Sequence, residues 1–304
     1  MIGRYAPSPT GELHLGNLRT ALLAWLFARA AGSRFLLRIE DLDPDRSRPE
    51  HVTTQLADLR AIGIDWDGEP VRQSERADAH AAALERLRDA GCVYRCFCSR
   101  REVREAASAQ HGAAPEGHYP GTCRALDPAE SARRAAAGER FALRLRAESA
   151  EVTYRDRLRG DRREIADDVV LRRRDGVLAY NLAVVVDDDE QAIEEVVRGD
   201  DLLPATAAQA LLCDLLGIAA PLWTHVPLVL GPDGARLAKR HGAVTLADLA
   251  RAGHDAADAR AWMARSLGLA EPGEKITAAA LVDRFDPSAL PREPTTFADL
   301  SPGP

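Results

Sequence analysis

The segment from Arg4 to Asn17, with the sequence RYAPSPTGELHLGN, constrains the fold more than any other part of the chain. Pro7 and Pro9 have no backbone N–H and hold the residues before them extended. Only a short strand, from Ile2 to Tyr5, can therefore precede them. The chain must then turn, and the segment predicts a strand and a sharp turn that lead into a helix.

The helix is predicted directly after this turn. Gly11 and Gly16 permit tight bends, and Asn17 is a good N-cap for the helically spaced residues Leu18, Leu22, Leu23 and Leu26. His14 then lies beside a helix N-terminus, where free amides and the helix dipole favour an anion and an imidazole can donate to phosphate. We therefore predict a phosphate site. His-x-Gly alone more often marks an ordinary turn with a solvent-facing histidine.

Strand and helix signals alternate along much of the chain. Apolar runs predict strands at 34–39, 168–171, 179–186 and 193–197, and helical patterns cover 49–61, 75–90 and 205–216. Such alternation is typical of an α/β fold, a Rossmann-type doubly wound parallel sheet. Ligands in such folds bind beyond the carboxyl ends of the strands, where Ser8 and Glu40 are expected.

A break in this alternation predicts an insertion, and two helices, at 255–267 and 278–285, are expected near the end of the chain. We expect four regions: 1–95, the first half of the Rossmann core; 96–166, an inserted α/β subdomain; 167–232, the second half of the core; and 233–304, a basic loop with a short helical C-terminal region.

Composition limits the classes of function. With 304 residues and 46% hydrophobic content the chain can bury a large core, and its net charge of −7 gives no general attraction to nucleic acid. Any RNA contact must come from a local basic face, for which Arg133, Arg134 and Arg172 to Arg174 are candidates, although such runs are more often a solvated surface. No signal peptide or membrane span is recognisable, so we expect a cytoplasmic protein.

Three of the five cysteines cluster in the inserted region. Cys96 and Cys98, followed by His118, Tyr119 and Cys123, offer three thiolates and two further donors, enough for one tetrahedral, structural zinc ion. Ligand chemistry alone favours His118 as the fourth ligand, since imidazole suits zinc better than phenol does. Any single cysteine is also often a small buried hydrophobe.

A basic loop follows a late strand, in the sequence LVLGPDGARLAKRHG from Leu228 to Gly242. Lys239 in this loop can balance negative charge that moves onto a leaving pyrophosphate, which requires no proton transfer. A Lys-Arg pair is otherwise usually solvated surface.

Four blocks in the same order resemble the glutamyl-type class I aminoacyl-tRNA synthetases. The stretch Pro7 to Asn17 resembles their HIGH signature, with Asn17 in its fourth position, and Arg38 to Asp43 and Gln73 to Arg76 resemble the next two blocks. The late loop resembles their KMSKS signature, at Arg236, Leu237, Ala238, Lys239 and Arg240. Arg236 and Ala238 replace the first lysine and the serine, and Ala238 cannot supply the serine hydroxyl.

This resemblance implies a substrate and a set of roles. ATP with Mg²⁺ would bind at His14, Gly16, Asn17 and Lys239, with His14 and Lys239 catalytic, and would activate L-glutamate to glutamyl-adenylate. The glutamate pocket would consist of Arg4, Tyr5, Ala6, Pro7, Ser8, Glu40, Tyr180 and Arg198. Guanidinium groups suit the carboxylates of glutamate, and Glu40 suits its ammonium. Glu40 could instead pair only with Arg38, and Tyr180 could be a half-buried strand aromatic.

A narrower resemblance is to the glutamyl-Q tRNA(Asp) synthetases within that family. Their zinc site has tyrosine as the fourth ligand, which implies Cys96, Cys98, Tyr119 and Cys123, with His118 as the rival to Tyr119. The resemblance thus implies that the insertion 96–166 bears the zinc and contacts nucleic acid. Only 64 residues follow Arg240, too few for an anticodon-binding domain. The resemblance implies activation without tRNA and transfer of glutamate to the queuosine cyclopentenediol at the wobble position of tRNA(Asp), by an enzyme we expect to be monomeric. The alternatives are a truncated synthetase that charges tRNA(Glu) and a non-catalytic RNA- or metabolite-binding paralogue.

Overall fold

A seven-stranded sheet forms the centre of the protein, whose computed structural model describes residues 1–99, 101–103, 118–238, 241–242 and 244–300. Its order is β3-β2-β1-β9-β10-β6-β7, and all neighbours are parallel except β6 and β7. The strands are β1 Gly3–Tyr5, β2 Phe35–Ile39, β3 Val71–Arg72, β6 Glu151–Asp156, β7 Gly160–Ile165, β9 Glu195–Gly199 and β10 Leu222–Val226.

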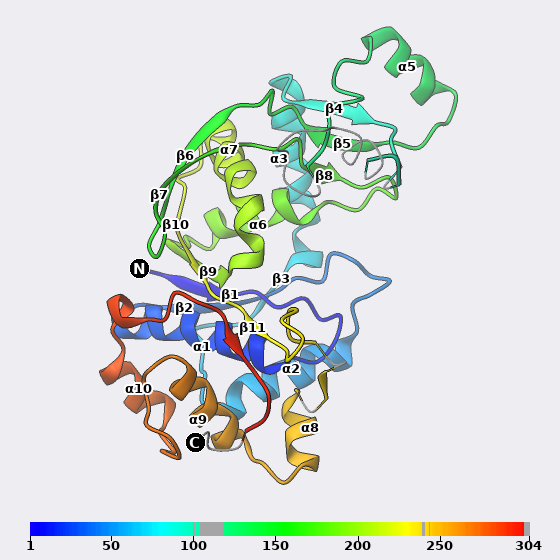
Figure 1. Cartoon of the computed structure of the whole chain (residues 1–304). Helices are drawn as coiled ribbons and strands as arrows, with labels where there is room; N and C mark the ends of the chain where they lie inside the picture. The colour runs from blue at the N-terminus through cyan, green and yellow to red at the C-terminus, as the bar shows by residue number, and fades with distance from the viewer. Residues whose placement is uncertain (100, 104–117, 239–240, 243, 301–304) are drawn as a thin grey trace.

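Helices cover both faces of this sheet (Figure 1). On one side lie α1 Leu15–Ala30, which packs on the sheet, and α2 Pro49–Ala61, with α9 Ala256–Ser266 and α10 Ala278–Arg284 packed in turn on α1. The other is packed against α3 Ala77–Asp89, α6 Tyr180–Glu190 and α7 Thr206–Leu216, and a separate hydrophobic core lies on each side. The doubly wound sheet predicted from the sequence is confirmed.

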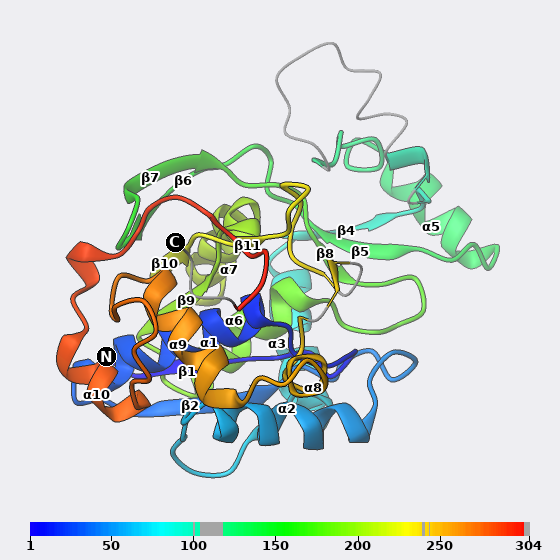
Figure 2. The same ribbon diagram turned by 60° about the horizontal axis from the view of Figure 1, so that its bottom comes forward.

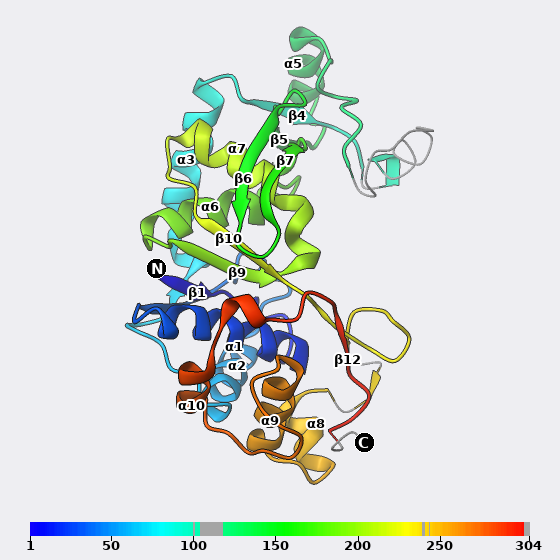
Figure 3. The same cartoon turned by 60° about the vertical axis from the view of Figure 1, so that its left-hand side comes forward.

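Helix α1 is the most enclosed helix of the first layer. Leu18, Leu22 and Leu26 have no exposed surface, because the sheet covers one side of the helix and the C-terminal helices cover the other. Phe27 contacts Phe285 edge to face, with ring centroids 4.9 Å apart. The predicted C-terminal helices are confirmed, and they stabilise the back of α1 (Figure 3).

A second, three-stranded antiparallel sheet stands apart from the first and lies on the far side of the molecule from α10 (Figure 2). It consists of β4 Val93–Cys96, β5 Ala142–Leu145 and β8 Val170–Arg172, and α5 Pro128–Ala136 lies beside it. The β6–β7 hairpin, which follows β5 in the chain, instead extends the main sheet. The segment 96–166 therefore contributes to both sheets.

Short elements complete the described chain: the 3₁₀ helices η1 Gln73–Arg76, η2 Asp200–Ala205 and η4 Pro287–Ala289, the parallel pair β11 Val229–Leu230 and β12 Thr295–Thr296, and helix α8 Leu246–Arg251. None of the helices in these residues is long and apolar enough to cross a membrane.

Two predictions of secondary structure were wrong. Residues 179–186, expected as a strand, begin the helix α6. This segment is mostly apolar and ends in three consecutive valines, so it has no clear period. Leu182, Val184 and Val185 are buried in the core in a helical arrangement that periodicity alone could not identify. The strand expected at 168–171 exists, but as β8 it belongs to the small sheet and not to the main one.

Candidate active site

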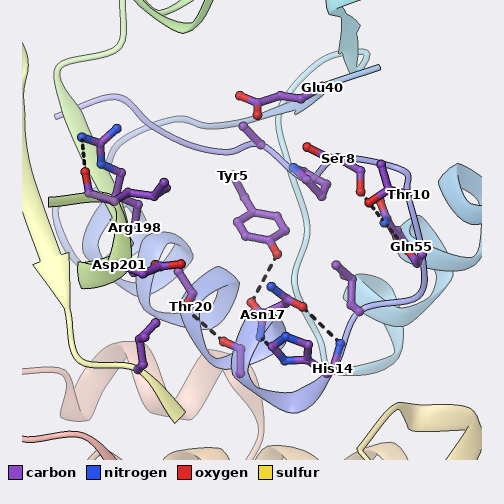
Figure 4. A pocket seen from close by; sticks show the side chains of 18 of the residues that line it. Tyr5, Ser8, Thr10, His14, Asn17, Thr20, Glu40, Gln55, Arg198 and Asp201 are labelled. Atoms are coloured by element: carbon purple, nitrogen blue, oxygen red, sulfur yellow. Dashed lines mark hydrogen bonds between the residues drawn. The ribbon is translucent and has the colours of Figure 1, made fainter. Parts of the chain in front are cut away.

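A cavity of about 550 Å³ opens where β1, β2 and β9 end. Because parallel strands present their carboxyl ends at one edge, residues far apart in the sequence meet there. Figure 4 shows Glu40 and Ser8 on one side of the cavity, Arg198 and Asp201 on another, and His14 with Asn17 at the helix. The structure brings together the predicted residues Arg4, Tyr5, Ala6, Pro7, Ser8, His14, Gly16, Asn17, Glu40, Tyr180, Arg198 and Arg236.

His14, not Asn17 as we predicted, is the N-cap of α1. The imidazole Nδ1 accepts a hydrogen bond from the Asn17 amide at 3.3 Å, and Asn17 Oδ1 accepts one from the His14 amide at 3.3 Å. This reciprocal capping box was not foreseen because histidine is an uncommon cap, whereas asparagine is a favoured one. It fixes the imidazole at the positive end of the helix, beside the cavity.

The capping contact also determines which imidazole nitrogen carries the proton. Burial, with the positive charge of Arg236 as a second cause, lowers the pKa of His14 to about 4. The ring is therefore neutral at pH 7, and because Nδ1 acts as an acceptor, Nε2 carries the hydrogen. A ligand in the cavity can thus receive one N–H donor from His14.

Gln55 of α2 fixes the turn between the two prolines and His14. Its side-chain amide donates to the carbonyl oxygens of Ser8 at 3.1 Å and Gly11 at 2.7 Å. Our sequence analysis missed this residue. The signal was available, because Gln55 is a polar residue on the same buried helix face as Val52 and Leu59.

Arg198 is a buried cation that forms no ion pair with a carboxylate of the described residues. Its side chain is 4% exposed, and among the described residues its hydrogen bonds go to neutral groups only. The acceptors are Gln209 Oε1 at 2.7 Å, Thr206 Oγ1 at 2.8 Å, His225 Nε2 at 3.0 Å, Tyr180 Oη at 3.4 Å and the Leu202 carbonyl at 3.5 Å. The guanidinium is therefore held in place with its charge available to the cavity.

Arg4, in contrast, is already paired. Its Nε lies 3.1 Å from Asp188 Oδ1, and Asp188 also binds Arg38, whose Nη2 lies 3.4 Å from Glu40 Oε1. Burial raises the pKa of Glu40, and the positive charges of Arg38 and Arg4 oppose that rise. Asp188 was not identified from the sequence, because it lies in an acidic stretch, Asp187 to Glu190, that reads as a solvated surface.

The KMSKS-like segment follows β11 in the chain, and its Arg236 lines the cavity. Arg236 forms an ion pair with Asp201, and Leu237 is buried in the core. The Ala238 amide donates to His241 Nδ1 at 3.0 Å. Lys239 and Arg240, predicted to belong to this site, lie outside the described residues.

Three thiols gather at the edge of the small sheet. The sulfur atoms of Cys96, Cys98 and Cys123 all lie within 4.8 Å of one another, and those of Cys98 and Cys123 are 3.4 Å apart. Three converging thiols, in a chain whose described cysteines are all free, are a donor set that suits a soft-ligand metal ion such as zinc.

Of the two candidates for a fourth donor, Tyr119 lies inside this cluster. Its hydroxyl is 3.4 Å from Cys96 Sγ and 3.6 Å from Cys98 Sγ, and it accepts from the Cys123 amide at 2.9 Å. The rival, His118, is 32% exposed, with its Nδ1 3.4 Å from Asp167 Oδ1.

Comparisons with known proteins agree with this architecture. Residues 1–286 match the family of tRNA synthetases class I (E and Q), catalytic domain. The chain is 59% identical to a glutamyl-Q tRNA(Asp) synthetase of Nocardia farcinica, covering 98% of this chain and 93% of that protein. It is 47% identical to the one of Symbiobacterium thermophilum, covering 100% and 99%. Its structure matches a crystal structure of a glutamate tRNA ligase from Elizabethkingia meningosepticum in complex with its amino acid, with a TM-score of 0.82 and 27% identity, over 98% of this chain and 67% of that one.

A doubly wound sheet, a capped helix beside a cavity and an inserted small sheet define the catalytic domain of a class I aminoacyl-tRNA synthetase. The chain belongs to the glutamyl- and glutaminyl-type family of these enzymes. Within that family, the relatives named glutamyl-Q tRNA(Asp) synthetases match it over nearly their whole length.

Proposed function

We propose that the chain activates L-glutamate with ATP, without tRNA, and transfers it to queuosine in tRNA(Asp). The full-length similarity to glutamyl-Q tRNA(Asp) synthetases supports the second half of this proposal. The observation that carries the first half is the unpaired charge of Arg198 at the cavity.

An uncompensated buried cation is costly, with an effective penalty of roughly several kcal/mol, and an anionic ligand removes that cost. One carboxylate of glutamate placed against Arg198 would supply the missing charge. Glu40, across the cavity, would receive the ammonium group, which a dicarboxylic acid without an amine could not offer. Arg4 contributes less free charge, because Asp188 already neutralises it.

ATP would bind with its phosphates at the N-terminus of α1. His14 Nε2–H and the Gly16 amide at the start of α1 would donate to phosphate oxygens, since the neighbouring amides of Leu15 and Asn17 already have acceptors, and Mg²⁺ would accompany the nucleotide. An oxygen of the glutamate α-carboxylate then attacks the α-phosphorus, and the bond to pyrophosphate breaks. Lys239, from the adjacent segment, would balance the charge on the leaving pyrophosphate. A hydroxyl of the queuosine ring next attacks the activated carbonyl, and AMP leaves.

Cys96, Cys98, Cys123 and Tyr119 would hold one structural zinc ion. The support for Tyr119 is the position of its hydroxyl among the three sulfurs, while His118 is engaged by Asp167. A metal with four protein ligands has no open position for chemistry, so it would stabilise the small sheet.

Two assays test this function. Glutamate-dependent exchange of pyrophosphate into ATP without tRNA is expected, and its absence under all conditions would favour a non-catalytic binding protein. Labelled glutamate is then offered to tRNA(Asp) with and without queuosine and to tRNA(Glu). We expect labelling of the queuosine-containing tRNA(Asp) alone. Equal labelling of both tRNA(Asp) forms, or labelling of tRNA(Glu) alone, would refute the proposed acceptor.

A further inference from the structure

Three neighbouring strands carry a hydrogen-bonded row that ends at the glutamate pocket. Arg198 on β9 is in register with His225 on β10, and Asp156 on β6 is in register with Trp223, two residues before His225. Arg198 Nε donates to His225 Nε2 at 3.0 Å, and His225 Nδ1 lies 2.6 Å from Asp156 Oδ2. His225 and Asp156 are at most 1% exposed, and neither lines the pocket.

The row has one possible arrangement of protons. Arg198 Nε can only donate, so His225 Nε2 must accept and cannot carry a hydrogen. The hydrogen is then on Nδ1, where it is donated to the Asp156 carboxylate. Asp156 thus selects the tautomer of His225 that can bind Arg198, although it never contacts Arg198 itself.

Asp156 is in turn fixed by the backbone. Its Oδ1 accepts from the amides of Leu158 and Arg159, both at 2.9 Å, in the turn that joins β6 to β7. Its Oδ2 also accepts from the His225 amide at 3.1 Å. The carboxylate therefore cannot rotate away from His225 without losing several hydrogen bonds.

We propose that His225 and Asp156 are positioning residues for Arg198 and thereby set the affinity of the pocket for glutamate. This inference rests on the proposed function, because it assigns Arg198 to a substrate carboxylate. Thr206 and Gln209 hold the two terminal nitrogens of the guanidinium at short distances, and His225 holds the third nitrogen, Nε. Without that contact the guanidinium can turn about its stem and lose its alignment with a carboxylate.

A matched pair of variants separates positioning from packing. His225→Gln places its amide oxygen near the position of Nε2 and keeps an acceptor for Arg198, whereas His225→Asn keeps a donor for Asp156 and loses that acceptor. Loss of a hydrogen bond to a charged group costs roughly 1.5–3 kcal/mol. We therefore expect a rise of about tenfold or more in the KM for glutamate for H225N, with a distinctly smaller rise for H225Q. The KM for ATP should be unchanged in both.

Asp156→Asn provides a second, nearly isosteric test. An amide nitrogen at this position can donate to Nδ1, which moves the imidazole hydrogen to Nε2 and sets it against the guanidinium. A rise in the KM for glutamate is expected although the residue is remote from substrate. Pyrophosphate exchange gives the KM for glutamate of all three variants, and thermal melting shows whether each is folded.

The possible results are distinct. If the wild-type protein shows no glutamate-dependent exchange, the proposed function fails. If it does, and H225N and H225Q raise the KM for glutamate equally, or D156N leaves it unchanged, the positioning role is refuted. If H225N does not fold, D156N and H225Q still decide the outcome through the same KM measurement.

Discussion

The charge of Arg198 leads to a sharp prediction about Gln209, a residue behind the pocket. Gln209→Glu changes one amide into a carboxylate of the same shape, with an oxygen at the present position of Oε1, 2.7 Å from Arg198 Nη1. Arg198 would then have the acidic partner that it now lacks. The pocket should lose most of its attraction for an anion without any change in the residues that line it.

The size of the effect follows from the geometry. A carboxylate of glutamate on the other side of the guanidinium would lie about 6 Å from the new one, and at an effective dielectric constant of about 20 their repulsion is roughly 3 kcal/mol. That corresponds to a rise of roughly 100-fold in the KM for glutamate. Glutamate-dependent pyrophosphate exchange, with ATP saturating, measures it.

The matched control is Gln209→Met, which has a similar volume and no charge. It loses the same hydrogen bond to Arg198, and also the one that Gln209 donates to Asn181 at 3.0 Å. We expect Q209M to raise the KM by about tenfold, as for one lost hydrogen bond to a charged group, and by distinctly less than Q209E does. Equal effects of Q209E and Q209M would show that the free charge of Arg198 does not capture glutamate.

Four further predictions concern other parts of the site. His14→Asn keeps an acceptor for the helix cap but removes the Nε2 donor, so kcat for exchange should fall by about 100-fold, while the melting temperature at pH 7 changes little; a kcat near wild type would exclude that donor role. Because burial lowers the pKa of His14 from 6.5 to about 4, the unfolded chain binds more protons between these values. Folding stability should therefore fall as the pH drops through this window. The free energy of unfolding, measured by urea titration at several pH values, should fall less steeply with pH for H14N than for the wild type; equal pH dependences would contradict the pKa shift. In the cysteine cluster, Cys98→Ala and Tyr119→Phe should lower the zinc content measured by metal analysis whereas His118→Ala should not, and full zinc in C98A would refute the ligand set. Gly231→Ala would place a Cβ 2.6 Å from the ring of His241, which should displace the KMSKS-like segment and raise the KM for ATP; an unchanged KM would argue against that coupling.

Local chemistry explains which elements could be predicted. The helices that begin at Pro49 and Ala278 have clear apolar periods and terminal signals, and their positions agree with the structure. The run after Ala179 has neither, and only packing against the sheet decided that it is helical. An inserted α/β subdomain was predicted correctly, but which strands form its sheet was out of reach, because one strand begins before the segment 96–166 and another comes after it.

The residues of the candidate site could also be predicted only in part. Arg4, Glu40 and Arg198 could be identified as charged residues near predicted strand ends, and the cavity brings them together. Which of them keeps a free charge could not be predicted. That depends on Asp188, which reaches Arg4 from a helix 184 positions away in the sequence and leaves Arg198 with neutral neighbours.

The sequence alone determined the doubly wound fold, the turn that leads into α1 and the cluster of thiols, because proline geometry, helical periods and ligand type act over a few residues. Only the tertiary structure decided the protonation and the hydrogen-bond partners of those groups. It made His14 the cap of α1 and a neutral donor, and it placed Tyr119 rather than His118 among the sulfurs. It also linked Arg198 to Asp156 through His225. Protonation and pairing depend on burial and on partners from distant segments, and these exist only once the chain has folded.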